Sequence, residues 1–461
     1  MNGSLKKTPM PVQDPRDRIH NFQEVALGYN EDQAKVEAER CLQCKTRPCV
    51  AGCPVGIQIP DFLAAIIRQD YLAAYRIISR DSLLPAVCGR VCPQETQCEA
   101  LCVRGKKGEP VGIGYCERFV ADWYFQHVST ENTLIQSNHR KVAVVGSGPA
   151  GLSCAYDLCL KGYDVEVYEA LHLPGGVLAY GIPEFRLPKA IVKREIDRLE
   201  QLGVKIHRNV IVGKTLLIDD LFEEGVQAVF LGTGAGLPNF MQIPGEMLNG
   251  VYSANEYLTR VNLMKAADKR SATPIFLAKH VAVVGGGNVA LDAARSAKRL
   301  GAETVTILYR RSMKELPARK EEIDHAVEEG ILFRTLTNPI AITGDEKGFV
   351  KSVECVKMLL GTIDASGRPR PIPDPNSTHK IDADAVIIAV GTTPNPLIMQ
   401  TSQLETNRWG CIVTRNDSGL TSRDFVYAGG DVVTGAATVI LAMGAGRKAA
   451  EAIDKDLCPT Q

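Results

Sequence analysis

The segment at 140–169, RKVAVVGSGPAGLSCAYDLCLKGYDVEVYE, sets out an order of elements that returns at 279–311 as KHVAVVGGGNVALDAARSAKRLGAETVTILYRR. Each copy predicts a buried apolar strand, a glycine turn, a helix and a second strand, which together form one βαβ unit. Parallel sheets of this kind need helices on both faces, because both faces are apolar. The repeat therefore predicts an α/β chain with two Rossmann-like dinucleotide-binding domains.

The rest of the chain divides around these two copies. Residues 1–138 are rich in helix formers and are interrupted by cysteine clusters, which predicts a separate helical domain. The apolar segments DAVIIAVGTTPNP and DFVYAGGDVVTGAATVILAMGAGRKAA return to strand and helix after the second copy. We expect a discontinuous first Rossmann domain at 139–265 and 388–461, and a second at 266–387, with NLMKAADKRSATPIFLAKH as the linker.

Composition excludes several kinds of partner. Lys plus Arg and Asp plus Glu both number 53, so no net field attracts nucleic acid or an anionic membrane. The N-terminus has no apolar core of a signal peptide, and runs such as AVIIAV are too short to span a bilayer, so we expect a cytoplasmic protein. Nine of the 14 cysteines fall between Cys41 and Cys116, a clustering that favours bound metal over disulfides.

The first glycine turn matches the pattern of a dinucleotide site. Gly146, Gly148 and Gly151 allow a tight turn and bring a pyrophosphate onto a helix N-terminus, although a plain strand-to-helix turn is the alternative for such a motif alone. Glu169 ends the second strand eighteen residues later, where a carboxylate can accept hydrogen bonds from a ribose diol. The acid strengthens the interpretation as a binding site.

The second turn differs at the position that selects the nucleotide. Gly285, Gly287 and Ala290 repeat the pattern, but Tyr309 aligns with the acid and is followed by Arg310 and Arg311. Two guanidiniums can pair with a ribose 2′-phosphate, so this domain is expected to prefer NADP(H); a solvated strand end is the alternative. The first site is then left for FAD, the usual partner when a hydride must become single electrons.

The cysteine runs favour iron-sulfur clusters. The spacing Cys41-x2-Cys44-x4-Cys49-x3-Cys53-Pro is similar to a ferredoxin run, in which the fourth thiolate reaches a neighbouring cluster. A second run, with cysteines at 88, 92, 98 and 102, supplies partners for two clusters. Structural zinc is the competing interpretation, but it favours two pairs of ligands further apart.

Several ordered motifs together resemble one family. These are the two cysteine runs, PVGIGYCERFVADW, VAVVGSGPAGL, GGVLAYGIPEFRLP, VAVVGGGNVALDAAR, YRRS with LPARKEEIDHAVEEG, and AGGDVVTGAATVILAMGAGRKAA. They are similar to the glutamate synthase small (beta) subunit family, which includes the NADPH-binding subunit of NADH-dependent ferredoxin:NADP oxidoreductase and the N-terminal half of dihydropyrimidine dehydrogenase. The resemblance covers essentially the whole chain and implies a helical double [4Fe-4S] cluster domain before the two Rossmann-like domains.

The resemblance also implies a ligand set for two [4Fe-4S] clusters. One cluster would be held by Cys41, Cys44, Cys49 and Cys102, and the other by Cys53, Cys92, Cys98 and the side-chain oxygen of Glu117. Cys116 is adjacent to that acid, but one step along a helix points it elsewhere. Cys88 matches a family cysteine that is not a ligand, and we interpret it as a small buried apolar residue.

The resemblance further implies nucleotide-binding residues. For FAD they are Gly146, Gly148, Pro149, Ala150, Gly151, Glu169, Gly176, Arg186, Val212, Gly430, Asp431 and Thr438. Asp431 would bind the ribityl chain, and the helix after it would point its N-terminus at the flavin. For NADP(H) the set is Gly285, Gly287, Asn288, Val289, Ala290, Arg310, Arg311 and Gly391.

The resemblance implies hydride transfer between nicotinamide and flavin, then single-electron steps through the clusters, or the reverse. Hydride transfer needs no acid or base, so no proton-transfer residue is predicted. The chain has no room for the amidotransferase and the FMN barrel of glutamate synthesis, so a second redox subunit must supply the substrate chemistry. It would be the glutamate synthase large subunit or, in a bifurcating ferredoxin:NADP oxidoreductase, a small FAD/[2Fe-2S] subunit. An iron-sulfur redox sensor is the alternative of another class.

Overall fold

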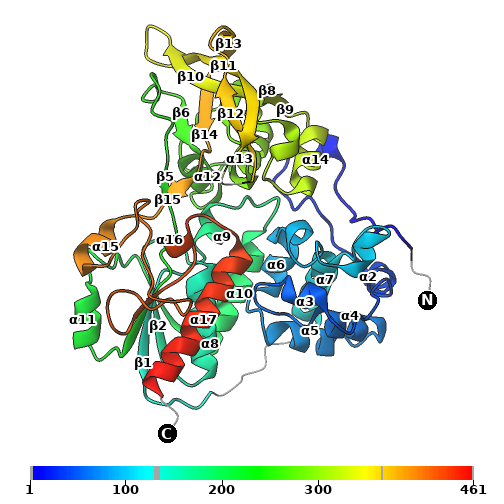
Figure 1. The fold of residues 1–461 in the computed structure, drawn as a ribbon, viewed down its shortest axis with the longest axis vertical. Helices are drawn as coiled ribbons and strands as arrows, with labels where there is room; N and C mark the ends of the chain where they lie inside the picture. Colours follow the sequence, from blue (N-terminus) through cyan, green and yellow to red (C-terminus); the bar gives the residue numbers. More distant parts are fainter. Residues whose placement is uncertain (1–3, 129–134, 365–366, 459–461) are drawn as a thin grey trace.

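The computed structural model describes residues 4–128, 135–364 and 367–458, which form three packed bodies (Figure 1). The helical body comprises α2 (Glu31–Ala38), α3 (Pro48–Ala51), α4 (Ile59–Ile67), α5 (Tyr71–Ser79), α6 (Pro85–Val91) and α7 (Ile113–His127), while the short α1 (Pro15–Arg18) precedes it and packs on the second Rossmann-like body. Its own core lies where α2, α4, α5 and α7 meet, because each presents apolar side chains such as Phe62, Ile66 and Val120 to the others. The cysteine runs lie on the short α3 and α6 and on the loops beside them.

The first Rossmann-like body contains a parallel sheet with the strand order β16-β4-β1-β2-β3. Its strands are β1 (Lys141–Val145), β2 (Asp164–Glu169), β3 (Lys205–Arg208), β4 (Ala228–Leu231) and β16 (Val426–Ala428). Its helices are α8 (Pro149–Leu160), α9 (Val177–Tyr180), α10 (Lys189–Gln201), α11 (Ile218–Glu223), α15 (Leu397–Ser402), α16 (Asp431–Thr434) and α17 (Val439–Leu457). The C-terminal segment therefore completes a sheet that begins almost 300 residues earlier.

The second Rossmann-like body repeats this plan with the strand order β6-β14-β7-β8-β9. Its strands are β6 (Val251–Ser253), β7 (His280–Val284), β8 (Thr304–Tyr309), β9 (Leu332–Thr335) and β14 (Ala385–Ile388), and its helices are α12 (Ala254–Asn262), α13 (Asn288–Arg299) and α14 (Lys320–Glu328). An antiparallel group extends it, with β10 (Thr337–Gly344), β11 (Val350–Ile363), β12 (Pro369–Pro373) and β13 (His379–Asp382). The two parallel sheets and the helical body confirm the expected fold class.

The structure moves one expected boundary. β6 pairs in parallel with β14 of the second sheet, so residues 251–262 belong to the second body, although we assigned residues up to 265 to the first. The chain crosses between the bodies at β5 (Leu237–Pro238) and β15 (Thr392–Thr393), which pair antiparallel. The polar stretch between α12 and β7, which we expected to be a linker between domains, is a loop within the second body. Loops and linkers have similar polar compositions because both are exposed to solvent.

Helix α17 packs unusually closely on α8. A Cβ on Gly446 would lie 2.2 Å from the carbonyl oxygen of Ala150, so only glycine permits this approach. The same apolar core takes in Leu84, Val87 and Cys92 of the helical body. Helix α6 and its cysteines are therefore packed directly against the first Rossmann-like body.

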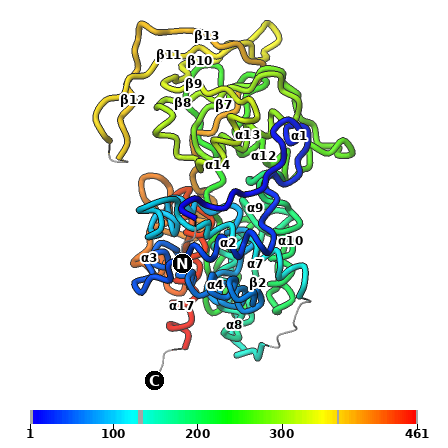
Figure 2. The backbone as a smooth tube through the Cα atoms, turned by 90° about the vertical axis from the view of Figure 1, so that its right-hand side faces the viewer, coloured from blue at the N-terminus to red at the C-terminus, as the bar shows by residue number. Residues whose placement is uncertain are grey.

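The N-terminal strap, residues 4–30, connects the bodies along one side (Figure 2). Arg18 in α1 is fully buried and donates from Nε to Glu329 Oε1 at 2.8 Å, on the second body. Further along, Val25 N donates to Phe185 O of the first body at 2.9 Å. Glu24 pairs with Arg90 of the helical body at 2.7 Å. The strap thus touches all three bodies.

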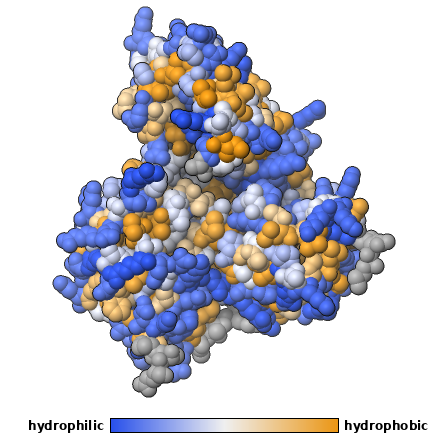
Figure 3. Space-filling view, viewed as in Figure 1, coloured by the Kyte–Doolittle hydropathy of each residue, from blue (hydrophilic) through white to orange (hydrophobic). Residues whose placement is uncertain are grey.

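Of the helices in the described residues, none is both long and apolar enough to cross a membrane. Apolar side chains on the face of Figure 3 lie in scattered patches between polar ones, and this surface is hollowed where the upper body meets the two lower ones.

Candidate functional site

The first glycine turn has the shape of a pyrophosphate cradle. Gly146 has φ 96°, and a Cβ there would lie 2.6 Å from Gly232 O, so the turn requires glycine. A Cβ on Gly151 would lie 1.9 Å from Gly146 O, which shows how tightly the start of α8 closes on the turn. Around Gly148, by contrast, the nearest atom to such a Cβ is 4.0 Å away. The middle glycine leaves open space for a phosphate at the helix N-terminus.

The acid at the end of β2 lies at this turn. Glu169 is buried, and its Oε2 accepts hydrogen bonds from the backbone N–H (3.0 Å) and the hydroxyl of Ser147. Ser147 Oγ in turn accepts from Gly175 N at 2.9 Å. Sequence reasoning missed this serine, because it occupies a variable position of the glycine motif and nothing in the motif marks it.

A second loop closes over the glycine turn. Gly176 has φ 54°, and a Cβ there would lie 2.9 Å from Gly148 Cα, so the loop can approach the turn only as glycine. On the other side, Gly430 with φ 76° places Asp431 at the start of α16, where Asp431 Oδ1 accepts from Ala437 N at 3.2 Å. Thr438 caps α17 by accepting from Leu441 N at 3.3 Å. The glycines of both turns, Asp431 and Thr438 thus lie along one edge of the sheet.

Tyr180, at the end of α9, is a further polar side chain near this edge that sequence reasoning missed. Burial raises the pKa of its hydroxyl to about 12, with Asp431 and Glu169 as the nearby negative charges. The phenol is therefore buried within electrostatic range of both predicted FAD carboxylates and stays protonated at neutral pH. Its apolar surroundings in GGVLAYGIP gave no sign of this position.

Two residues of the expected FAD set have other surroundings. Val212 is buried in the core beneath the sheet. Arg186 donates from Nη1 to both carboxylate oxygens of Asp292 at 2.8 Å, and its Nε lies 3.1 Å from Glu322. The guanidinium of Arg186 thus joins the first body to α13 and α14 of the second, and its contact with FAD stays a prediction.

The second glycine turn repeats the cradle at the start of α13. Gly285 has φ 142° and would clash with Ala389 O at 2.4 Å if it carried a Cβ, whereas no atom lies within 4 Å of a Cβ on Gly287. Asn288 Oδ1 accepts from Arg319 N at 3.0 Å, Val289 is exposed, and Ala290 is buried where the third glycine would be. Gly391, with φ 105°, accepts a hydrogen bond from Asn239 N. The free space lies over the middle glycine, as in the first turn.

The structure separates the two arginines that follow β8. Arg310 is exposed. Arg311 is buried, donates from Nε to Pro369 O at 2.8 Å, and pairs through Nη2 with Asp364 at 2.7 Å. The sequence motif predicted that both guanidiniums bind the 2′-phosphate, but only that of Arg310 is exposed to solvent beside the glycine turn.

The electrostatic neighbours of the cysteines fall into two groups, while their assignment to two clusters stays a prediction. In the first group, burial raises the pKa of the Cys41 thiol, and negative charge on Cys102 and Cys44 raises it further. Burial likewise raises the pKa of Cys49 to about 11, with Cys41 and Cys102 as neighbours. All four thiols of this group are half-buried.

The second group lies deeper. Burial raises the pKa of Cys53 to about 11, and its charged neighbours are Glu117 and Cys88. Cys98 has a raised pKa from burial and is also influenced by Cys53 and Glu117. Cys92 is buried at the end of α6. This group therefore lies between α6, α7 and the first cysteine run.

Glu117 fits the role of an oxygen ligand. Its side chain is buried, Oε1 has no hydrogen-bond partner, and burial raises the pKa of its carboxyl to about 8, with Glu195 as the next cause. A buried polar atom without a partner is costly unless something binds it. Iron of the second cluster would supply that partner, and the soft thiolates around it suit an iron-sulfur cluster.

The remaining cysteines of this domain differ in location. Cys116 faces Glu37 and Glu99, as the helical step predicted. Cys88 lies against Met443, with 3.6 Å between the sulfurs, and also contacts Cys92, so it is buried beside the second group. All 14 cysteines are free. Among the residues that the structure describes, no three acidic, cysteine or histidine side chains converge closely enough for a single metal ion.

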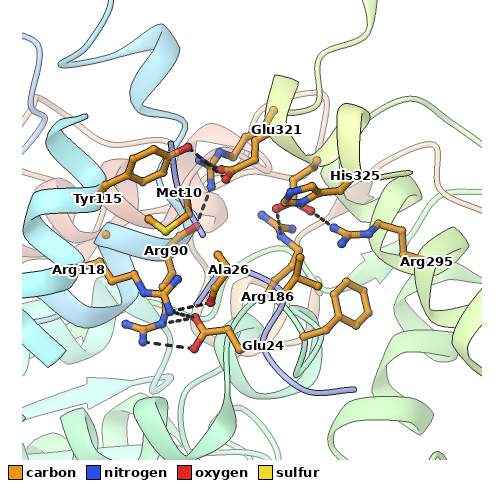
Figure 4. Close-up of a pocket in the computed structure, with 15 residues that line it drawn as sticks. Met10, Glu24, Ala26, Arg90, Tyr115, Arg118, Arg186, Arg295, Glu321 and His325 are labelled. Atoms are coloured by element: carbon orange, nitrogen blue, oxygen red, sulfur yellow. Dashed lines mark hydrogen bonds and ion pairs between the residues drawn. The ribbon is translucent and has the colours of Figure 1, made fainter. Parts of the chain in front are cut away.

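A small cavity of about 30 Å³ marks the junction of the three bodies and the strap (Figure 4). Five arginines line it: Arg90 and Arg118 from the helical body, Arg186 from the first Rossmann-like body, and Arg295 and Arg319 from the second. Each is paired with a carboxylate, the acids being Glu24, Asp122, Asp292, Glu321, Glu322 and Glu329. The cavity has about the volume of one water molecule. It is a charge-balanced contact between bodies.

Two glycine cradles and two thiol groups in one chain define a class of protein, a nicotinamide- and flavin-dependent iron-sulfur oxidoreductase. Residues 18–129 match the family described as dihydropyrimidine dehydrogenase domain II, 4Fe-4S cluster, and residues 140–446 match the family of pyridine nucleotide-disulphide oxidoreductases. The chain belongs to the glutamate synthase small-subunit family, as its motifs suggested.

Curated relatives carry different names within this class. The chain is 36% identical over 453 residues to the glutamate synthase (NADPH) small chain of Azospirillum brasilense, covering 96% of this chain and 93% of the relative. It is 38% identical to the NADP(+)-dependent formate dehydrogenase subunit beta of Moorella thermoacetica, with 89% of this chain and 60% of that one covered. It is 35% identical to the NADPH-Fe(3+) oxidoreductase subunit beta of Geobacter sulfurreducens, with 95% and 68% covered.

Solved structures share the fold of the two Rossmann-like bodies. FprA of Mycobacterium tuberculosis, in complex with NADPH, aligns with a TM-score of 0.58 at 21% identity, over 69% of this chain and 84% of that one. Thioredoxin reductase of Lactococcus lactis aligns with a TM-score of 0.52 at 23% identity, over 68% and 98%.

Proposed function

We propose that the chain is the electron-input subunit of a cytoplasmic NADPH-dependent glutamate synthase, passing electrons between NADP(H), FAD and two [4Fe-4S] clusters and a large subunit. The observation that carries this proposal is the order of the sites. Cys92 of the second thiol group is packed in the same core as α8 and α17 of the first body, whereas the four thiols of the first group are half-buried. In this proposal the two clusters would form a path from the first glycine cradle towards the surface.

The residues of the chain have defined tasks in this proposal. The second glycine turn and Arg310 would bind NADP(H), and the first turn with Glu169, Tyr180 and Asp431 would hold FAD. Bound FAD supplies the conversion of a hydride into single electrons. Because no proton transfer is required for hydride transfer, the chain contributes positioning and a fixed electrostatic environment.

Similarity to a relative with this role supports the choice of partner. The chain is 36% identical to the glutamate synthase small chain of Azospirillum and covers 93% of its length. The second candidate is the NADPH-binding subunit of a bifurcating ferredoxin:NADP oxidoreductase, which the same cofactor order would serve. Anaerobic copurification distinguishes the two candidates. A large subunit with an amidotransferase domain supports the first, and a small flavoprotein with a [2Fe-2S] cluster supports the second.

The electron path is tested by anaerobic reduction of the holoprotein. NADPH should remove the visible absorbance of the flavin and then produce the EPR signals of reduced clusters. In Cys44→Ser the flavin should still be reduced, whereas electron delivery to the partner should fall strongly, because the exposed cluster is damaged. Cys458→Ser is the matched control, since that cysteine is exposed and lies far along the chain. Unimpaired delivery in Cys44→Ser would refute the proposed order.

A further inference from the structure

The hairpin of β11 and β12 extends from the second body beside the segment that follows β8. Strand β12 pairs antiparallel with the far half of β11, from Met358↔Pro373 to Ile363↔Pro369, whereas β13 pairs with the near half. Three prolines of β12, at 369, 371 and 373, have no backbone N–H, so its outer edge cannot take a further strand in full. The far half is thus a two-stranded arm, which is marginal by itself in water.

Arg311 fastens this arm to the Rossmann-like sheet. Its guanidinium reaches Pro369 O at 2.8 Å and Asp364 Oδ2 at 2.7 Å, and its side chain is only 4% exposed. Its backbone oxygen accepts from Leu336 N at 3.0 Å, and Leu336 O accepts from Met358 N at 2.8 Å. One residue therefore connects the end of β8 to both strands of the arm.

Other polar side chains of the same segment also form hydrogen bonds within the second body. Ser312 Oγ donates to Glu315 Oε2 at 2.6 Å, and Tyr309 OH donates to Glu315 O at 2.7 Å. The Tyr309 ring covers the glycine turn, since a Cβ on Gly286 would lie 2.6 Å from it. Arg310 comes directly after this tyrosine and is exposed, as is Lys314 further on. Within the described residues neither of these two cations forms an ion pair closer than 4.0 Å.

We propose that Arg310 alone is the arginine that binds the ribose 2′-phosphate, and that Arg311 and Asp364 are positioning residues that hold the β11–β12 arm and the turn presenting Arg310. This inference rests on the NADP(H) preference in the proposed function. A planar guanidinium with two bonds to the arm cannot offer the same donors to a phosphate. Arg310 is exposed and lies beside the turn, so its guanidinium can donate hydrogen bonds to the phosphate.

The test compares binding and arm mobility in the anaerobic holoprotein. Calorimetric titration gives the ratio of the Kd values for NAD⁺ and NADP⁺, and hydrogen exchange reports on residues 358–364 and 367–373. Arg310→Ser should lower the ratio about 10- to 100-fold, the loss of one or more charge-assisted bonds, and leave exchange in the arm unchanged. Lys314→Ser is the matched control for an exposed cation and should leave the ratio within about twofold.

Arg311→Ser and Asp364→Asn should both speed exchange in the arm and lower the ratio by a similar, smaller factor. The double variant should be no worse than Arg311→Ser alone, because that change already removes the contact with Asp364. The inference is overturned if Arg311→Ser lowers the ratio as much as Arg310→Ser with exchange unchanged, or if Asp364→Asn tightens NADP⁺ binding by releasing Arg311. A wild-type protein without preference for NADP⁺ would instead refute the nucleotide choice of the proposed function and the role of Arg310. The exchange data would still decide the contact of Arg311 with the arm.

Discussion

Replacing Glu329 by glutamine should destabilise the second Rossmann-like body and release the strap. Its buried carboxylate accepts five hydrogen bonds of 2.7–3.0 Å from Arg18, Arg295 and Arg299, and all four side chains are 0% exposed. Removing one charge from a buried ion cluster costs about 3–5 kcal/mol, because the remaining charges keep their desolvation penalty. For a domain of this size that corresponds to a fall in Tm of about 6–20 °C.

The neighbouring Glu328 provides the matched control. It also pairs with Arg18, at 2.7 Å, but is 49% exposed, so Glu328→Gln should cost under about 1 kcal/mol. Calorimetry of the anaerobic holoprotein gives the two Tm values, and limited proteolysis of residues 4–30 reports release of the strap. If both variants shifted Tm equally, or if Glu329→Gln left the strap protected, the buried charge cluster would not be what fastens it.

Three further changes test other parts of the molecule. Glu117→Ala should alter the EPR signal of one cluster and spare the other, because three thiolates remain on the affected cluster; two unaltered signals would remove this acid from the ligand set. Gly89→Ala should weaken the packing of α6 on α7 by about 1–3 kcal/mol and speed loss of iron to a chelator, because its Cβ would lie 2.6 Å from Arg118 N. The control Gly105→Ala, whose Cβ has its nearest neighbour at 3.7 Å, should change neither the stability nor the rate of iron loss. Burial, and next the charge of Arg295, lowers the pKa of His325 below 6.5, so the native protein binds fewer protons than the unfolded protein. The native state therefore loses stability relative to the unfolded state as pH falls below 6.5. His325→Gln should flatten the dependence of Tm on pH in that range.

The local parts of the site could be predicted from sequence, because their signals are short in range. The glycine turns, the acid at the end of β2 and the cysteine spacings each lie within one βαβ unit or one loop. The family resemblance then added the division of the cysteines into two ligand sets, which stays a prediction.

The long-range contacts could not be predicted in this way. Arg18 and Glu329 are 311 residues apart, and Arg186 and Asp292 are 106 apart, so no periodicity or spacing connects them. Arg310 and Arg311 are identical in chemistry, and only the path of the β11–β12 arm makes one buried and one exposed. The short β6 was missed for a related reason, since three residues carry too little pattern to identify a strand.

The interleaved chain order has a consequence for biosynthesis. The second Rossmann-like body is contiguous between β5 and β15, so it can close as soon as it leaves the ribosome. The first body cannot close before β16 and α17 are translated, and α17 also covers α6 beside the second thiol group. Closure of the first body therefore follows closure of the second, and a nascent chain truncated before residue 426 should retain the structure of the second body but bind no flavin.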